Sequence, residues 1–178
     1  MAAHERSTDF THSSNPAQQD YDWLYYRYLM PHITGKVLDI GAGYLQFVKE
    51  YAKKDDVTSI LCLDKFTEEA HAVEKATRKE WICPEILPEG KFDTIVSTEF
   101  VEHIVREQFE PLLEQIVTRL TDDGKFVGST PNKMFPTTNP YHLYEYTKGE
   151  LEEILKKYFS RVTVDLSRVD CTLLIAQK

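Results

Sequence analysis

Short apolar runs and longer amphipathic stretches alternate along most of this chain. Runs of four to six mainly apolar residues are typical of buried strands, and apolar residues spaced three and four apart are typical of helices. The predicted strands are 37–40, 59–63, a poorly marked one near 80–83, 92–97 and 125–129. The predicted helices are 44–54, 67–78 and 106–120. A regular alternation of this kind predicts an α/β domain.

The C-terminal part adds one helix and two strands. Thr147-Lys148-Gly149-Glu150 forms a capping box, which predicts a helix that reaches Tyr158 and Phe159. The segments 162–166 and 172–176 then read as two strands close enough to pair antiparallel. The whole pattern predicts a doubly wound, mostly parallel sheet that ends in an antiparallel strand.

The N-terminal residues differ from the rest. Residues 1–18 are polar and without periodicity, so we expect a flexible arm there and a single domain over 19–178. Residues 19–30 are rich in tyrosine and predict an aromatic helix. That helix either packs on the core or caps a substrate pocket, and the sequence favours neither.

Composition narrows the class of protein. The 178 residues suffice to bury a core, and a net charge of −8 argues against broad binding to phosphate backbones. Cys62, Cys83 and Cys171 lack metal-binding spacing and are expected as reduced thiols. No long apolar run or lipidation motif occurs, which predicts a soluble, cytoplasmic protein without a membrane span.

The strand at 37–40 opens directly into Gly41-Ala42-Gly43, and Asp64 ends the next strand. Glycine lets a backbone approach a ligand closely, and an acid at the second strand end can accept hydrogen bonds from a cofactor ribose. Leu45 lies where a dinucleotide fingerprint carries its third glycine. This pattern favours S-adenosylmethionine over a dinucleotide, although a nicotinamide or nucleotide-sugar enzyme stays an alternative.

A second set of polar residues follows the strand at 92–97. Glu99, Glu102 and His103 have the i, i+3, i+4 spacing that would place them on one face of a helical turn. His142 lies in a later loop that opens at the same edge of the sheet. Two carboxylates and imidazoles suit Mg, Mn, Fe or Co better than a structural zinc. A solvated helix start with acids at its N-terminal end is the alternative.

These motifs together resemble the seven-stranded, class I S-adenosylmethionine-dependent methyltransferases over residues 20–178. The stretch from Thr98 to Ile104, with Ser129-Thr130-Pro131-Asn132 and His142, is similar to two branches of that superfamily. One branch comprises the ubiquinone-biosynthesis O-methyltransferases. The other comprises the small-RNA 3′-terminal 2′-O-methyltransferases, in which Glu-x-x-Glu-His and a distant His hold a divalent metal.

The resemblance implies roles for individual residues. The metal ligands implied by it are Glu99, Glu102, His103 and His142. The implied cofactor-binding residues are Asp39, Gly41, Ala42, Gly43, Asp64, Lys65, Glu85, Thr98 and Glu99. No Asp occurs where the family contacts adenine after the third strand; Cys83 falls there, and Glu85 is the nearest acid.

The predicted reaction is methyl transfer from S-adenosylmethionine to a hydroxyl. A cation such as Mg or Mn chelated by two adjacent hydroxyls would lower the pKa of the attacking one, which predicts a vicinal diol on a small molecule or glycan. Without a metal, His103 or His142 would serve as the general base. Methylation of an RNA 3′-terminal ribose is the second hypothesis, and a non-catalytic cofactor-binding subunit is the third. The sequence leaves the oligomeric state open.

Overall fold

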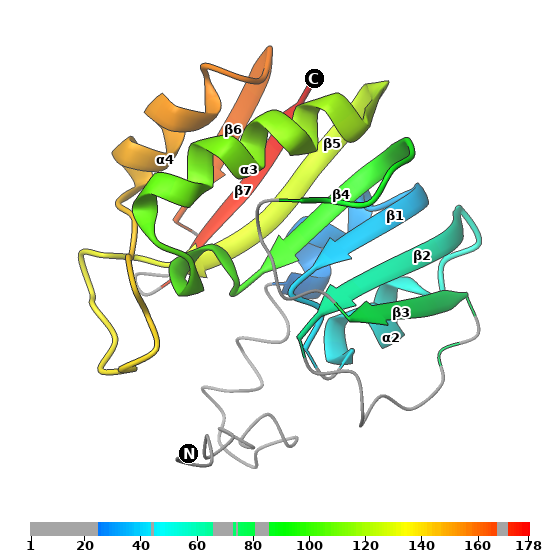
Figure 1. The fold of residues 1–178 in the computed structure, drawn as a ribbon, viewed down its shortest axis with the longest axis horizontal. Coiled ribbons are helices and arrows are strands. Elements are labelled where there is room, and N and C mark those ends of the chain that lie inside the picture. The colour runs from blue at the N-terminus through cyan, green and yellow to red at the C-terminus, as the bar shows by residue number, and fades with distance from the viewer. Residues whose placement is uncertain (1–24, 44, 66–72, 74, 81–85, 167–170) are drawn as a thin grey trace.

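The centre of the molecule is a seven-stranded sheet with the strand order β3-β2-β1-β4-β5-β7-β6 (Figure 1). The computed structural model describes residues 25–43, 45–65, 73, 75–80, 86–166 and 171–178. The first five strands run parallel, and β7 lies antiparallel between β5 and β6. The predicted doubly wound sheet with an antiparallel C-terminal strand is therefore confirmed.

The described elements have the following bounds. The strands are β1 (Gly35–Ile40), β2 (Val57–Asp64), β3 (Ala76–Glu80), β4 (Phe92–Thr98), β5 (Leu120–Pro131), β6 (Arg161–Asp165) and β7 (Cys171–Gln177). The α-helices are α2 (Gln46–Tyr51), α3 (Arg106–Arg119) and α4 (Lys148–Leu155). The short turns are η1 (Tyr25–Leu29), which is π-helical, and two 3-10 turns, η2 (Met30–His32) and η3 (Val101–His103).

Several predicted boundaries were wrong. The third strand spans Ala76–Glu80 rather than 80–83, so the predicted helix at 67–78 cannot extend through its last three residues. Most of that helix lies outside the described residues. β3 is an edge strand, and edge strands need no buried apolar face, which explains its weak sequence signal. β5 begins at Leu120, five residues earlier than expected.

The C-terminal helix starts as predicted and ends early. Thr147 and Glu150 form both hydrogen bonds of the capping box, with the Thr147 side chain accepting from the Glu150 N–H and the Glu150 carboxylate accepting from the Thr147 N–H. Helix α4 ends at Leu155, and a turn rather than helix covers 156–158. The two strands that follow pair antiparallel as predicted.

Helices cover both faces of the sheet, and each face has its own core. Helices α3 and α4 lie on one face, and α2 lies on the other (Figure 1). The first core includes Phe109, Phe126 and Leu151, and the second includes Leu29, Val48 and other buried side chains. Leu29 is fully buried, so the described end of the aromatic segment packs on this second core. Residues 1–24, which include the predicted arm, lie outside the described residues.

Two further expectations concern thiols and membranes. Cys62 and Cys171 are buried thiols that form no disulfide among the described residues, as predicted, whereas Cys83 lies outside those residues. Within the described part of the chain, no helix has both the length and the apolar character needed to cross a membrane.

Candidate active site

The loop after β1 forms an open cradle at the carboxyl edge of the sheet. Gly41 and Gly43 have φ angles of +76° and +50°, which favour glycine. The Gly43 N–H donates to the Asp64 carboxylate at 2.8 Å, and this fastens the loop to the end of β2. Among the described residues, its chain neighbours apart, a Cβ atom at Gly43 would meet no atom within 4 Å, whereas one at Gly41 would lie 2.5 Å from the Phe100 ring. The loop is therefore closely packed on one side and open on the other, as a cofactor cradle requires.

Asp39 lies on β1, two residues before Gly41. It is a buried acid, and only one of its two carboxylate oxygens has a hydrogen-bond partner among the described residues. The Tyr51 hydroxyl on α2 donates to Asp39 Oδ2 at 2.6 Å. Asp39 Oδ1 is buried and has no hydrogen-bond partner among the described residues. Burial raises the pKa of Asp39 to about 7, although the Tyr51 hydrogen bond opposes this shift. An acid that stays partly protonated at neutral pH therefore lies directly beneath the glycine loop.

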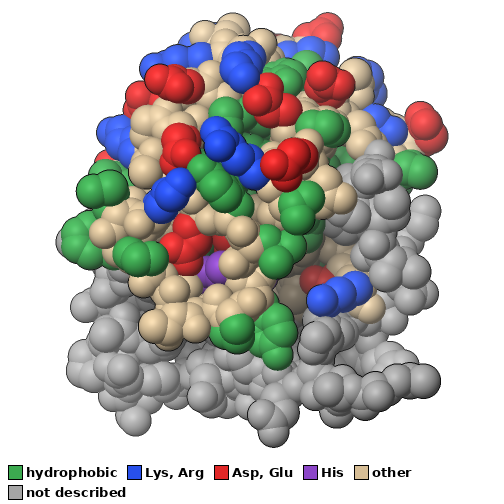
Figure 2. Space-filling view, turned by 60° about the vertical axis from the view of Figure 1, so that its left-hand side comes forward, with side chains coloured by type: hydrophobic (Ala, Val, Ile, Leu, Met, Phe, Trp, Pro, Cys, Tyr) green, Lys and Arg blue, Asp and Glu red, His purple; other side chains and the backbone are tan. Residues whose placement is uncertain are grey.

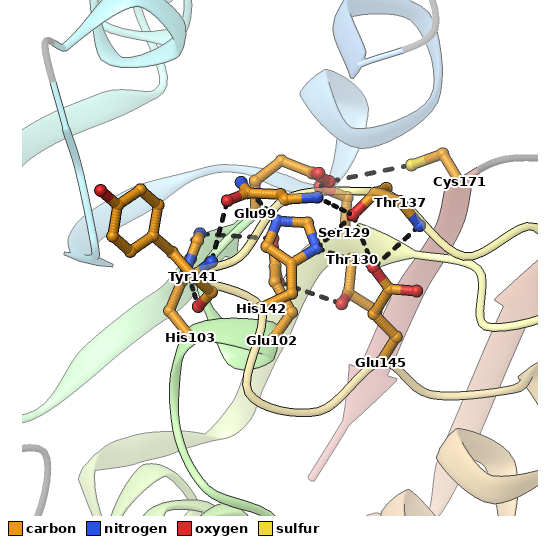
Figure 3. Close-up of polar contacts among 11 residues, drawn as sticks. Glu99, Glu102, His103, Ser129, Thr130, Thr137, Tyr141, His142, Glu145 and Cys171 are labelled. Carbon is orange, nitrogen blue, oxygen red and sulfur yellow. Dashed lines mark hydrogen bonds and ion pairs between the residues drawn. The ribbon is translucent and has the colours of Figure 1, made fainter. Parts of the chain in front are cut away.

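Three side chains that could bind a metal converge beside this loop. Glu102, His103 and His142 each offer one ligand atom, and these atoms all lie within 4.8 Å of one another. The two imidazole rings meet edge to face with centroids 5.0 Å apart. Figure 3 shows these side chains grouped between η3 and the loop before α4, and in the space-filling view a histidine lies in a recess bordered by acidic side chains (Figure 2). The fold thus brings His142 to the Glu102-His103 pair, and the metal and catalytic roles predicted for these residues stay predictions.

Backbone hydrogen bonds hold the two segments of this cluster together. The Leu143 and Tyr144 N–H groups both donate to the Glu102 carbonyl, at 2.7 and 3.2 Å. His103 Nδ1 lies 3.0 Å from the Tyr141 carbonyl. A carbonyl only accepts, so His103 must carry its proton on Nδ1 and direct the Nε2 lone pair toward the cluster. Burial lowers the pKa of His103, which keeps the imidazole neutral at physiological pH.

Glu102 is a buried carboxylate that the protein satisfies only in part. Its side chain is fully buried, and Oε2 accepts a hydrogen bond from Thr130 Oγ1 at 3.1 Å. Oε1 has no hydrogen-bond partner in the described structure, although His103 Nε2 lies 3.8 Å away. Burial, and then the charge of Glu99, raise the pKa of Glu102 well above its usual range. An acceptor oxygen facing an imidazole lone pair is the arrangement that a cation between them would satisfy, so these residues fit a divalent ion.

Glu99 does not share a helical face with Glu102 and His103, contrary to the prediction. It precedes η3 and has a left-handed φ of +49°, so it lies outside the helical turn. Its Oε1 accepts from Ser129 Oγ at 2.8 Å and lies 3.9 Å from Cys171 Sγ. It is not among the three residues whose ligand atoms are mutually close. The predicted metal and cofactor roles of Glu99 stay predictions.

Sequence reasoning missed the residues that support His142. Glu145 Oε1 lies 2.7 Å from His142 Nδ1 and accepts from Thr137 Oγ1 at the same distance (Figure 3). Burial alone would raise the pKa of Glu145, but the hydrogen bonds from His142 and Thr137 hold it below its usual value. Glu145 follows His142 by three residues in an irregular loop, where no periodicity relates side chains, so spacing gave no signal.

The remaining predicted cofactor residues are distributed around the same edge. Lys65 directly follows β2. The pKa of His103 is lowered mainly by burial, and the charges of His142 and then Lys65 lower it further. Thr98 ends β4 and pairs with Ser129 of β5. Ala42 donates its N–H to the Leu63 carbonyl at 3.2 Å. Glu85 and Cys83, expected near the adenine, lie outside the described residues.

Comparison with known proteins identifies the family. A family model described as a methyltransferase domain matches residues 15–166 of the chain. The chain belongs to this family. The match covers strands β1 to β6, the glycine loop and the Glu102-His103-His142 cluster, and it confirms the predicted enzyme class. No curated protein matches the chain in sequence.

Solved structures share the fold at low sequence identity. The chain is similar to an S-adenosylmethionine-dependent methyltransferase from Archaeoglobus fulgidus, with 18% identity, a TM-score of 0.74, and 90% of this chain and 94% of the other covered. It is also similar to the N-methyltransferase NodS from Bradyrhizobium japonicum bound to S-adenosylhomocysteine, with 14% identity, a TM-score of 0.73, and 98% and 93% covered. A third similar structure is an S-adenosylmethionine-dependent methyltransferase from Mesorhizobium loti. The sequence identity is 16% and the TM-score is 0.67, and the match covers 88% of this chain and 97% of the other. The predicted class I methyltransferase fold is therefore confirmed.

Proposed function

We propose that this methyltransferase moves the methyl group of S-adenosylmethionine to one hydroxyl of a vicinal diol on a small molecule or glycan. We further propose that a divalent cation held by Glu102, His103 and His142 assists the transfer. The observation that carries this proposal is the buried Glu102 carboxylate, whose Oε1 has no hydrogen-bond partner among the residues that the structure describes and lies close to two imidazoles. The fold itself does not select oxygen as the acceptor, because the similar NodS structure is described as an N-methyltransferase.

The cradle after β1 supports the choice of cofactor. Bound S-adenosylmethionine would supply an electrophilic methyl group on a sulfonium. Asp64, at the end of β2, has the position from which a carboxylate can accept hydrogen bonds from ribose hydroxyls. The open side of Gly43 among the described residues and the hydrogen bond that fastens this loop to Asp64 are consistent with such a binding site. Asp39, Gly41, Ala42, Lys65, Thr98, Glu99 and Glu85 complete the proposed cofactor-binding set.

The donor set at the cluster supports a divalent transition-metal cation such as Mn better than Mg. One carboxylate and two imidazoles offer mixed oxygen and nitrogen ligands, which first-row divalent ions accept. A cation there would act as a Lewis acid that lowers the pKa of a nearby hydroxyl. A diol is the acceptor that can chelate such a cation with both oxygens, which is why the proposal specifies adjacent hydroxyls.

The proton of the attacking hydroxyl needs an acceptor, and the histidines provide one. His103 is neutral at physiological pH, and its Nε2 lone pair faces the cluster because Nδ1 donates to the Tyr141 carbonyl. With no cation on this nitrogen, it can take a proton from a hydroxyl placed beside Glu102; with a cation bound there, the lone pair is occupied and the activated hydroxyl would lose its proton to water. His142 offers a second imidazole within the same group of ligand atoms. With a cation bound, these residues would position the acceptor; without one, either imidazole could remove its proton.

Two binding measurements test the cofactor and the cation separately. Calorimetric titration with S-adenosylhomocysteine should give micromolar affinity, and Mn²⁺ binding should be visible by electron paramagnetic resonance. In Glu102→Gln a neutral amide replaces an anionic ligand, so we expect Mn²⁺ affinity to fall by more than about tenfold with little change for S-adenosylhomocysteine. Glu107→Gln, an exposed position on α3, is the matched control and should bind both as wild type. Equal Mn²⁺ affinity in Glu102→Gln and wild type would refute the cation site.

Acceptor assays test the chemistry. Catechol, a simple glycoside diol and an RNA with a free 3′-terminal diol are incubated with methyl-labelled S-adenosylmethionine, each beside an analogue that keeps only one hydroxyl. Transfer to a small diol that is lost with the single-hydroxyl analogue and with a chelator supports the proposal. Equal transfer to the single-hydroxyl compounds would refute the diol requirement. Transfer to RNA alone would replace the small-molecule acceptor with the nucleic-acid end.

A further inference from the structure

The amide of Asn139 fixes which nitrogen of His142 carries the proton. The Tyr141 backbone N–H donates to Asn139 Oδ1 at 3.0 Å, so the oxygen end of this amide is determined by a donor that cannot be reversed. The amide nitrogen Nδ2 therefore faces His142 Nε2, at 3.0 Å. Since Nδ2 only donates, His142 Nε2 must accept and the ring proton must be on Nδ1.

The Nδ1 proton of His142 is directed at Glu145. The distance from Nδ1 to Glu145 Oε1 is 2.7 Å, and the two side chains are only 10% and 9% exposed. Thr137 lies beside both, with Oγ1 2.7 Å from Nδ1 and donating to Glu145 Oε1 at 2.7 Å, while its backbone N–H donates to the same oxygen at 3.2 Å. Glu145 thus has a fixed orientation, because Thr137 holds the oxygen that His142 uses.

From this geometry we propose that Glu145 is a positioning residue that holds His142 as the Nδ1–H tautomer. With that proton engaged, Nε2 is the nitrogen that can offer its lone pair to a cation or to an acceptor proton. A carboxylate behind a ligating imidazole also raises its basicity and fixes the ring plane. The use of Nε2 by a cation rests on the proposed function above, whereas the tautomer itself does not.

Asn139 would compete with any ligand for Nε2 of His142. Its amide donates to Nε2 in this structure, and therefore occupies the lone pair that a cation would use. Any ligand at Nε2 must replace this hydrogen bond. Because Glu145 and Thr137 hold the opposite side of the ring, the imidazole can exchange Asn139 for a ligand without rotating.

The tautomer is measured directly by long-range ¹H–¹⁵N correlation spectra of protein labelled at histidine. Spectra are taken at about pH 8.5, where an ordinary imidazole is neutral, and the His142 signals are identified by their loss in His142→Gln. Wild type should show the Nδ1–H pattern. Glu145→Ala should shift to a mixture or to Nε2–H, and Glu145→Gln should keep the wild-type pattern because its amide oxygen still accepts. Retention of the wild-type pattern in Glu145→Ala would overturn the proposal.

Cation affinity gives the second readout. We expect Glu145→Ala to weaken Mn²⁺ binding by about 10- to 100-fold, Glu145→Gln to weaken it less, and both to keep the affinity for S-adenosylhomocysteine. Glu114→Ala, an exposed position on α3, is the control for loss of an acid. If the wild-type protein binds Mn²⁺ and Glu145→Ala binds it with the same affinity, the positioning role is contradicted. If wild type does not bind Mn²⁺ at all, the cation site fails while the tautomer spectra still decide the role of Glu145.

Discussion

Asp39→Asn should make the protein more stable at neutral and alkaline pH. Asp39 is fully buried, and its pKa rises from an ordinary value of 3.8 to about 7 because of that burial. Above pH 7 the folded protein must hold an ionised carboxylate in an apolar environment. An amide of the same shape removes this charge, while its oxygen can still accept the hydrogen bond from Tyr51.

The size of the effect follows from the two pKa values. Because the folded state binds the proton more tightly than the unfolded state, the stability of wild type falls as pH rises from 3.8 to about 7 and is constant above. The full difference corresponds to about 4 kcal/mol, and about 2.5 kcal/mol of it develops between pH 5 and pH 8. Asp39→Asn lacks this dependence, so its advantage over wild type should grow by that amount across the interval.

Urea unfolding of both proteins at several pH values between about 5 and 8 measures this difference. Titrating groups that do not interact with Asp39 are present in both proteins and cancel, whereas Asp64, whose charge raises the pKa of Asp39, adds a small difference. Tyr51→Phe serves as the second variant, since losing the donor should raise the pKa of Asp39 further and move the transition to higher pH. A stability difference between Asp39→Asn and wild type that does not change with pH would refute the reasoning.

Two further changes test the cofactor cradle and the C-terminal helix. Asp64→Ala removes the acceptor of the Gly43 N–H, and with it the proposed ribose ligand, so S-adenosylhomocysteine binding should be lost in calorimetry while circular dichroism stays that of wild type; unchanged affinity would show that the ribose lies elsewhere. Thr147→Ala removes the side chain that accepts from the Glu150 N–H, and should lower the free energy of unfolding by about 1 kcal/mol in urea titrations. No loss of stability there would mean that packing alone starts α4.

The sheet could be predicted because its central strands are apolar on both faces. The run before Gly41 lies on β1 and the run before Glu99 lies on β4, at the centre of the sheet, and each contains a short apolar stretch, Val37-Leu38 or Ile95-Val96, that is fully buried. β3 was misplaced for the opposite reason. Ala76–Glu80 lies at the edge, pairs with β2 on one side only, and has no alternation to mark it.

The site could be predicted only in part, because its two halves are related by folding and not by spacing. Glu102 and His103 are adjacent in sequence, and the opening of their loop at the carboxyl edge predicted their partner His142. Glu99 was misjudged because a helical spacing was assumed across a residue that adopts a left-handed backbone. The roles of Tyr141 and Glu145 could not be predicted from the sequence. The Tyr141 carbonyl faces Nδ1 of His103 and the Glu145 carboxylate faces Nδ1 of His142, and only the folded structure shows these two contacts.

Two of the buried side-chain oxygens that have no hydrogen-bond partner among the described residues belong to carboxylates, and these two lie at functionally related places. Asp39 Oδ1 is at the end of β1 beneath the glycine loop, and Glu102 Oε1 is in the turn after β4, the strand that pairs with β1. Burying an acid without a partner costs stability, so a fold that bound nothing here would be more stable with apolar or amide residues at both positions. Parallel strands bring their carboxyl ends to one edge, which is where ligands of doubly wound sheets bind. The same edge therefore carries both energetic penalties and both proposed ligands, as expected if the ligands offset the cost of the buried acids.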